Sequence, residues 1–308
     1  MLKYLIVMLD DTSVSYCYYD SVSRKPRLMP LDVLKAGLTW AMKENLMVQV
    51  VYPDREISEE YLAAINEVDH VDIVAGDRVG DVRVFNGIET LARHGRADGL
   101  CVLRLTYGEL CDHAGEIADI LERCGDMNIV ITDIECMDDD DFDAYRQALD
   151  ALSRRLVDML GAGKAVRLNL LTDRLQLERM KNCNAGVESI TLAPDGRFYV
   201  CPAFYLDGST AVGEPSRGVE IKNCRLLTLE GSPICRNCDA YHCRRCAWLN
   251  GRMTLEVNTP GHRQCVVSHI ERNASRQLLS LVNDGGRVRI DRVIPKIDYL
   301  DPFEKIIQ

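Results

Sequence analysis

The sequence predicts an α/β protein in which parallel strands alternate with covering helices, followed by a cysteine-rich segment. Two observations predict this class. Short apolar runs alternate with amphipathic helical patterns through residues 1–172, which is the pattern of a parallel sheet that is buried on both faces. Eight of the thirteen cysteines then lie between Cys183 and Cys265.

The expected strands and helices follow one another from the N-terminus. Residues 1–9 form an apolar run that predicts the first strand, and residues 31–45 carry apolar side chains at helical spacing. Six strand–helix rounds fit a doubly wound sheet or an incomplete β/α barrel, and both place a ligand at the carboxyl ends of the strands. The other expected strands are 47–52, 71–75, 100–105, 127–132 and 166–171, and the other helices are 58–68, 88–93, 113–123 and 139–160.

The pattern changes after residue 172. A short helix is expected at 176–181, and a hairpin pairs 190–192 with 197–200 around Pro194-Asp195-Gly196. A long helical pattern returns at 264–282, and residues 288–294 resemble a strand.

Composition excludes several classes of protein. The net charge of −10 is wrong for a general nucleic-acid binder, which needs a basic surface. Acidic residues 138–141 predict a solvated helix start. No secretory signal and no apolar run of membrane-spanning length are present. We therefore expect a cytoplasmic protein without a membrane partner, whose cysteines serve metal or redox chemistry.

The densest cysteine segment reads Cys235-x2-Cys238-x4-Cys243-x2-Cys246. Pairs of this kind present two sulfurs to one metal, and their short separation favours iron–sulfur clusters over zinc ribbons. Zinc and unliganded buried thiols remain alternatives. His242 lies between the pairs and is a candidate ligand or hydrogen-bond donor to the ligands.

The order of cysteines resembles a SPASM domain, the C-terminal extension of peptide-modifying radical SAM enzymes. The matching features are Cys183, a Gly-x4-Cys that ends at Cys201, the two close pairs and a final Cys265. The resemblance implies one or two auxiliary 4Fe–4S clusters. Cys183, Cys201 and Cys246 would hold the first, with Cys224 as a possible fourth ligand, and Cys235, Cys238, Cys243 and Cys265 would hold the second.

The upstream region then resembles the partial, TIM-like (β/α)6 barrel of radical SAM enzymes, without their Cys-x3-Cys-x2-Cys motif. Asp10 and Val14 stand at the first two positions and Cys17 at the third. The Gly-Gly-Glu expected after the second strand is also absent. The resemblance implies a degenerate barrel over 1–178, a SPASM-type domain over 179–285 and a tail over 286–308. The Ser15-Tyr16-Cys17-Tyr18-Tyr19 loop resembles the CXXX repeat peptide maturases.

The resemblance implies maturation of a ribosomally made, cysteine-repeat peptide. The protein would bind the precursor or pass electrons to a partner radical SAM maturase, and S-adenosylmethionine is not expected as its own cofactor. A non-catalytic iron–sulfur or zinc scaffold and an active enzyme with an atypical first cluster are the alternatives. No catalytic acid, base or nucleophile is identified, so enzymatic activity stays open, and Cys17 and Cys136 are read as passive thiols.

Overall fold

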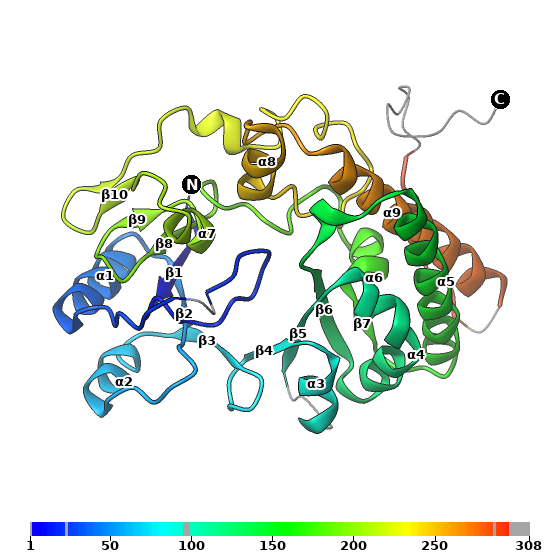
Figure 1. The fold of residues 1–308 in the computed structure, drawn as a ribbon, viewed down its shortest axis with the longest axis horizontal. Helices are drawn as coiled ribbons and strands as arrows, with labels where there is room; N and C mark the ends of the chain where they lie inside the picture. The colour runs from blue at the N-terminus through cyan, green and yellow to red at the C-terminus, as the bar shows by residue number, and fades with distance from the viewer. Residues whose placement is uncertain (1, 22–23, 95–98, 286–287, 296–308) are drawn as a thin grey trace. The chain divides into compact units, whose positions relative to one another are not determined.

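The computed structural model describes residues 2–21, 24–94, 99–285 and 288–295. Contacts divide the chain into two compact units, each built from two stretches of sequence. Unit 1 contains residues 1–85 and 184–228, and unit 2 contains residues 86–183 and the chain from residue 229 onward. Figure 1 labels the helices and strands of both.

Unit 1 is built on a sheet with β1 (Tyr4–Met8) inside it and β2 (Met47–Val51) and β8 (Ser189–Leu192) on either side. All three strands are parallel, and the run continues through two further strands. Short antiparallel strands extend the other edge. The further strands are β3 (His70–Ala75), β4 (Val82–Asn86), β9 (Phe198–Tyr199), β10 (Gly213–Glu214) and β11 (Gly218–Val219).

Apolar side chains of alternate strand positions form the core of unit 1. Leu5 and Val7 of β1 are fully buried, together with Val50 of β2 and Leu192 of β8. Helix α1 (Leu31–Lys43) covers them with a face that includes Leu34. The remaining helical elements of this unit are α2 (Glu59–Ile65), α7 (Pro202–Leu206) and the 3-10 turn η2 (Cys224–Leu227).

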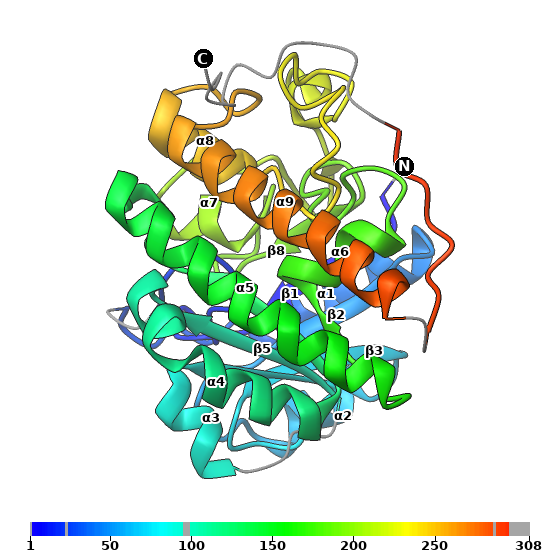
Figure 2. The same cartoon turned by 90° about the vertical axis from the view of Figure 1, so that its right-hand side faces the viewer.

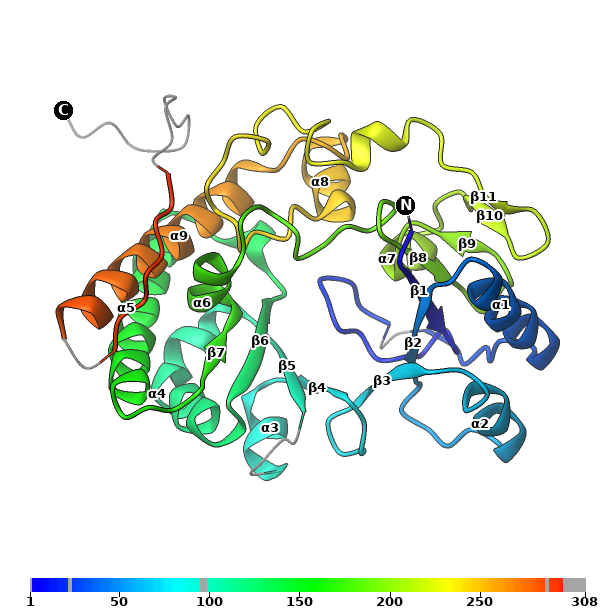
Figure 3. The same cartoon turned by 180° about the vertical axis from the view of Figure 1, so that it is seen from behind.

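Unit 2 contains a three-stranded parallel sheet in the order β5 (Leu100–Leu105), β6 (Asp126–Ile131) and β7 (Arg167–Leu168). The long helices α4 (Tyr107–Cys124), α5 (Asp139–Gly161) and α9 (His262–Asp284) belong to this unit, and α5 packs against both of the others (Figure 2). Helix α6 (Asn169–Gln176) follows β7 directly and also packs against α9 (Figure 3). The shorter elements are α3 (Ile88–His94), η1 (Ile134–Cys136) and α8 (Ala247–Thr254).

Capping boxes set the starts of two of these helices. Thr106 accepts a hydrogen bond from the backbone N–H of Glu109, whose carboxylate accepts from Thr106 in return. Asp138 and Asp141 make the same reciprocal pair at the start of α5. Because these acids satisfy the free N–H groups of the first turn, the run 138–141 is the helix start that the sequence predicted.

The element boundaries differ from expectation in several places. Helix α4 starts at Tyr107, β4 was not predicted, and residues 169–176 are helical where a strand was predicted to reach 171. Residues 177–181 are not a helix, and the described residues 288–295 contain no strand. The hairpin around Gly196 is confirmed, with φ of +84° at that glycine. No helix within the described ranges has both the length and the apolarity needed to cross a membrane.

Candidate functional site

The loop after β1, residues 10–21, is fixed to the ends of β1 and β2 in unit 1. Ser13 Oγ donates a hydrogen bond to the carbonyl oxygen of Val51 at 2.8 Å, and the N–H of Val14 donates to that of Tyr52 at 2.9 Å. Ser21 Oγ donates to the carbonyl oxygen of Ser13 at 2.6 Å. These bonds satisfy buried polar groups and give the loop one defined course.

Asp10 stands where the resemblance expects the first cluster-binding cysteine. Its buried carboxylate accepts hydrogen bonds from Thr12 Oγ1 and from Arg55, both at 2.6 Å. Burial raises the pKa of Asp10, but the bonds from Thr12 and Arg55 outweigh it and hold the pKa below its ordinary value. Val14 at the second position is buried, and Cys17 at the third is half-buried. This donor set does not fit a cluster that needs three thiolates.

Two tyrosines that the sequence analysis missed flank Cys201 in unit 1. Tyr205 donates to Asp11 at 2.5 Å and Tyr199 to Asp195 at 2.8 Å, with the two rings edge-on at 5.1 Å. Burial and then the carboxylate contact raise the pKa of Tyr199 to about 12 and raise that of Tyr205 as well. Both phenols therefore stay protonated as donors and anchor the segment around Cys201.

Three of the predicted ligands come together in unit 2. Cys235 is buried in one apolar cluster with Met180 and Ala240, and the partly buried Cys238 and Cys243 pack against that cluster. The sequence places these cysteines in a turn-rich loop, and the structure folds that loop so that the thiols share one apolar environment. The predicted grouping of these three thiols therefore has a structural basis, although no metal geometry follows from it.

Backbone N–H groups point at three of the sulfurs. The N–H of Ala240 donates to Cys238 Sγ at 3.5 Å, and that of Arg245 donates to Cys243 Sγ at 3.4 Å. In both cases the donor lies two residues after the cysteine. Cys246 caps α8 and accepts from the N–H of Leu249 at 3.5 Å. Hydrogen bonds of this kind stabilise a thiolate relative to a thiol.

Burial opposes the thiolate form in the absence of a metal. It raises the pKa of Cys235 to about 12 and that of Cys238 to about 12, and it also raises the pKa of Cys243. These thiols are therefore protonated at neutral pH, so a metal that bound here would have to displace their protons. A buried set of thiols that deprotonates only on binding a metal is suited to a permanent cofactor rather than to a reactive nucleophile.

Asp239, in the same loop, is surrounded by three arginines. Arg174 of α6 donates to its carboxylate at 2.6 Å and to its carbonyl oxygen at 2.9 Å. Arg272 and Arg276 of α9 contact the carboxylate at 3.3 Å and 2.7 Å. Arg174 and Arg272 are almost fully buried, whereas Arg276 is half-exposed. Helices α6 and α9 thus hold the cysteine loop through one carboxylate.

Two buried histidines adjoin the same loop. His269 Nε2 of α9 lies 3.6 Å from Cys238 Sγ. His242 Nε2 lies 3.1 Å from a carboxylate oxygen of Glu271, and Tyr145 of α5 donates to the other oxygen of Glu271 at 2.7 Å. His242 was named from the sequence, whereas the residues of α5 and α9 carried no sequence signal that linked them to it.

The other predicted ligands are divided between the two units. Cys183, Cys246 and Cys265 belong to unit 2, and Cys201 belongs to unit 1 together with the exposed Cys224. Within the residues that the structure describes, no three His, Cys, Asp or Glu side chains are arranged to hold a single metal ion. Assignment of all seven cysteines to two clusters therefore stays a prediction.

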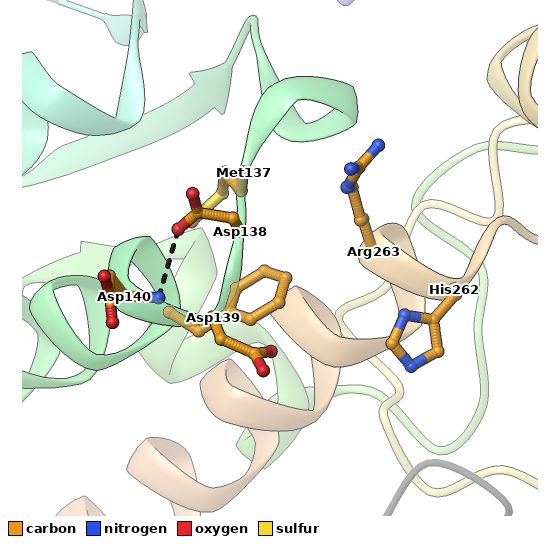
Figure 4. A pocket seen from close by; sticks show the side chains of 7 residues that line it. Met137, Asp138, Asp139, Asp140, His262 and Arg263 are labelled. Carbon is orange, nitrogen blue, oxygen red and sulfur yellow. Dashed lines mark hydrogen bonds between the residues drawn. The ribbon is translucent and has the colours of Figure 1, made fainter.

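A pocket of about 440 Å³ lies at the adjoining starts of α5 and α9 (Figure 4). Three aspartates line one side and His262 and Arg263 the other. Asp138 is used as the cap of α5, and Arg263 donates to the carbonyl oxygen of Glu135 at 2.8 Å. Asp138 thus stabilises the start of α5, and Arg263 links the start of α9 to the chain at Glu135. The lining residues are Met137, Asp138, Asp139, Asp140, Phe142, His262 and Arg263.

No protein-family model matches the sequence, and no curated protein matches it. Among solved structures, the fold is similar to hexahistidine-tagged anSMEcpe with bound AdoMet, with a TM-score of 0.64 and 11% identity over 92% of this chain and 96% of that one. It is also similar to native anSMEcpe with AdoMet and the Kp18Cys peptide. The TM-score is 0.60 and the identity is 12%, over 91% of this chain and 99% of that one. For native anSMEcpe with AdoMet and the Cp18Cys peptide, the TM-score is 0.58 and the identity is 11%, over 91% of this chain and 99% of that one. This likeness confirms the predicted α/β fold.

One sequence-based expectation is wrong. S-adenosylmethionine was not expected because the three-cysteine motif is absent, yet the similar structures hold AdoMet. The error came from reading the small-molecule ligand from a cluster motif alone. The fold that carries AdoMet in those proteins extends over most of this chain, so a missing motif is no argument against the ligand.

Proposed function

We propose that this protein takes part in the maturation of a peptide and that its substrate or cargo is a cysteine-containing precursor. The observation that carries the proposal is a group of three thiols in one apolar cluster, in a chain whose fold is similar to that of an AdoMet-bound protein. The similar structures with bound Kp18Cys and Cp18Cys peptides support a peptide as the partner. A partner radical SAM maturase that receives electrons or the bound precursor is part of the same proposal.

The cysteine segment, taken as 179–285, is the proposed cofactor domain. Cys235, Cys238 and Cys243 would hold an iron–sulfur cluster with Cys265, and Cys183, Cys201 and Cys246 would serve a second. The donor set supports this assignment, since three thiols share one environment and N–H groups are directed at Cys238 and Cys243. When bound, such a cluster supplies one-electron transfer. The loop's own residues exclude water and hold the sulfurs in place.

We also propose S-adenosylmethionine as a ligand of the fold, on the strength of the AdoMet-bound structures. The loop after β1 does not fit a three-thiolate cluster, because Arg55 neutralises Asp10 and Val14 offers no donor. We therefore derive no reaction step through a cluster at that position. An active radical SAM enzyme with an atypical first site is the second candidate function, and the same likeness favours it.

The first experiment measures iron, sulfide and the visible spectrum of anaerobically purified protein. About eight irons per chain with broad absorbance fit two 4Fe–4S clusters. The Cys238→Ala variant should lose iron, and the matched Cys136→Ala variant, in which an exposed thiol is removed, should not. A colourless protein without iron contradicts the cofactor proposal.

The second experiment separates the two candidate functions. Calorimetry with S-adenosylmethionine and with a synthetic cysteine-repeat peptide measures binding without turnover. Formation of 5′-deoxyadenosine under reducing conditions then reports cleavage by the chain itself. Peptide binding without cleavage supports the partner-dependent function, cleavage supports the active enzyme, and failure to bind any cysteine-containing peptide contradicts peptide maturation.

A further inference from the structure

The loop after β1 stands where the resemblance expects a cluster-binding motif, but only the third motif position holds a cysteine. Asp10 and Val14 occupy the other two positions, and residues 10–21 contain no cysteine besides Cys17. Where a loop does bind a metal, thiolates from several positions meet on that metal and help to order the chain. This loop must therefore be ordered by other contacts.

The carboxylate of Asp10 is fully buried, and each of its oxygens has donors of its own. Oδ1 accepts hydrogen bonds from the N–H of Thr12 at 2.9 Å and from Thr12 Oγ1 at 2.6 Å. Oδ2 accepts from Arg55 Nη2 at 2.6 Å. Because a guanidinium at bonding distance offsets the negative charge, this buried group needs no metal to neutralise it.

The backbone of the loop is closed by its own serine side chains. The N–H of Asp10 donates to Ser13 Oγ at 3.0 Å, and the N–H of Ser13 donates to the carbonyl oxygen of Asp10 at 2.9 Å. At the far end of the loop, the N–H of Ser21 donates to Ser15 Oγ at 3.0 Å. Both ends are thus satisfied within unit 1 by protein donors and acceptors.

Arg55 is itself held by the next loop along the sheet. It lies between β2 and α2, and its carbonyl oxygen accepts a hydrogen bond from Arg78 Nη1 at 3.0 Å. Arg78 lies between β3 and β4, and its Nε is 4.0 Å from the carboxylate of Asp54. Charged side chains therefore join the loops that follow β1, β2 and β3, which are neighbouring parallel strands.

We propose that the Asp10–Arg55 ion pair takes the structural place of a metal cluster in this loop, so that residues 10–21 are ordered without iron. This replacement goes beyond the proposed function, which concerns the cysteine segment 179–285. It weighs against the second candidate, because an enzyme with its first cluster in this loop needs thiolates where the chain holds an ion pair.

Hydrogen–deuterium exchange of the full chain tests the replacement, in iron-loaded protein and in protein stripped of iron by a chelator. Peptides that cover residues 10–21 should exchange at the same rate in both forms. Cys17→Ala should leave both this rate and the iron content unchanged. The comparison of the two wild-type forms needs no substitution, so it decides the matter even if a variant fails to fold.

Arg55→Ala provides the second measurement. Exchange of residues 10–21 should become about tenfold faster or more, because the buried carboxylate loses its charged donor. Arg217→Ala is the matched control, since it removes an exposed ion pair with Glu214 in the same unit and should leave the loop unchanged.

Slower exchange of residues 10–21 in the iron-loaded form that disappears in Cys17→Ala would overturn the replacement and support the second candidate function. An unchanged rate in Arg55→Ala would also overturn it, because other contacts would then order the loop. A chain that binds neither iron nor a cysteine-containing peptide contradicts the proposed function, whereas the exchange rate of Arg55→Ala still decides whether the ion pair orders this loop.

Discussion

Replacement of Asp239 by asparagine should strongly destabilise unit 2. The substitution keeps the size of the side chain but removes the one carboxylate that three arginines contact. Arg174 would keep its bond to the backbone carbonyl oxygen of residue 239, whereas its buried charge and that of Arg272 would lose the contact with the Asp239 carboxylate. Breaking a buried ion pair by removing one partner costs about 3–5 kcal/mol. With a urea m-value of about 3 kcal/mol/M, the midpoint should fall by about 1–1.7 M.

Urea unfolding followed by circular dichroism measures this change. The control is Glu230→Gln, which breaks the exposed pair with Arg179 at 3.2 Å and should cost at most about 1 kcal/mol. If Asp239→Asn costs no more than Glu230→Gln, the carboxylate is not what neutralises the buried guanidinium groups, and the electrostatic reasoning is wrong.

The same carboxylate predicts a dependence on pH. Burial raises the pKa of Asp239, but Arg174, Arg272 and Arg276 outweigh it, so the folded-state pKa lies below the ordinary value of 3.8. A depressed folded-state pKa stabilises the protein above the unfolded value, and this contribution is lost as the pH falls through the folded value. Wild-type protein should lose this contribution only below pH 3.8, and Asp239→Asn should show no such loss.

Three further results are expected. Arg55→Ala should raise the pKa of Asp10 and lower the free energy of unfolding by about 1–3 kcal/mol, because a buried carboxylate loses a charged donor. Carboxyl ¹³C NMR measures the pKa, and an unchanged value would contradict this reasoning. Gly213→Ala should cost about 1–3 kcal/mol in urea unfolding, since a Cβ would lie 2.0 Å from the carbonyl oxygen of Gly218; wild-type stability would show that the β10–β11 hairpin can shift. Cys238→Ala should lower bound iron, measured by colorimetric assay against Cys136→Ala, and equal iron in both variants excludes Cys238 as a ligand.

Long elements with regular apolar spacing could be predicted from the sequence. Strands β1, β2, β5 and β6 and helix α5 lie close to their expected bounds, because burial of apolar strand runs on both faces, or of one apolar helix face, fixes them. Strand β4 was missed since Val82–Asn86 is short and mixes polar with apolar residues.

The chain after residue 166 shows where local patterns fail. An apolar run predicted a strand over 166–171, but only two residues pair with β6 before α6 begins. Thr172 Oγ1 bonds to the backbone of Leu168, and Asn169 bonds to the backbone of Ile129 on β6. The bonds of Asn169 to the distant strand β6 and the local bonds of Thr172 favour the helix, and the contact with β6 cannot be read from the run itself.

In the candidate site, too, local features could be predicted from the sequence and contacts between distant residues could not. The sequence grouped Cys235, Cys238 and Cys243 because their spacing is local. It could not connect Asp239 with Arg174 on α6 or His242 with Glu271 on α9, since those partners are distant in sequence and have no motif of their own.

The ion pairs of Arg174 and Arg272 with Asp239 have a consequence for how the proposed cofactor would bind. In many small metal sites the ligand loop is disordered until the metal arrives, and binding must overcome the entropy of ordering it. Here an ion pair already fixes the residue that follows Cys238, so ordering of the loop is completed by folding of the chain. The cysteine loop is therefore held in place in the folded chain, and the proposed cluster would assemble on it with little further change in backbone.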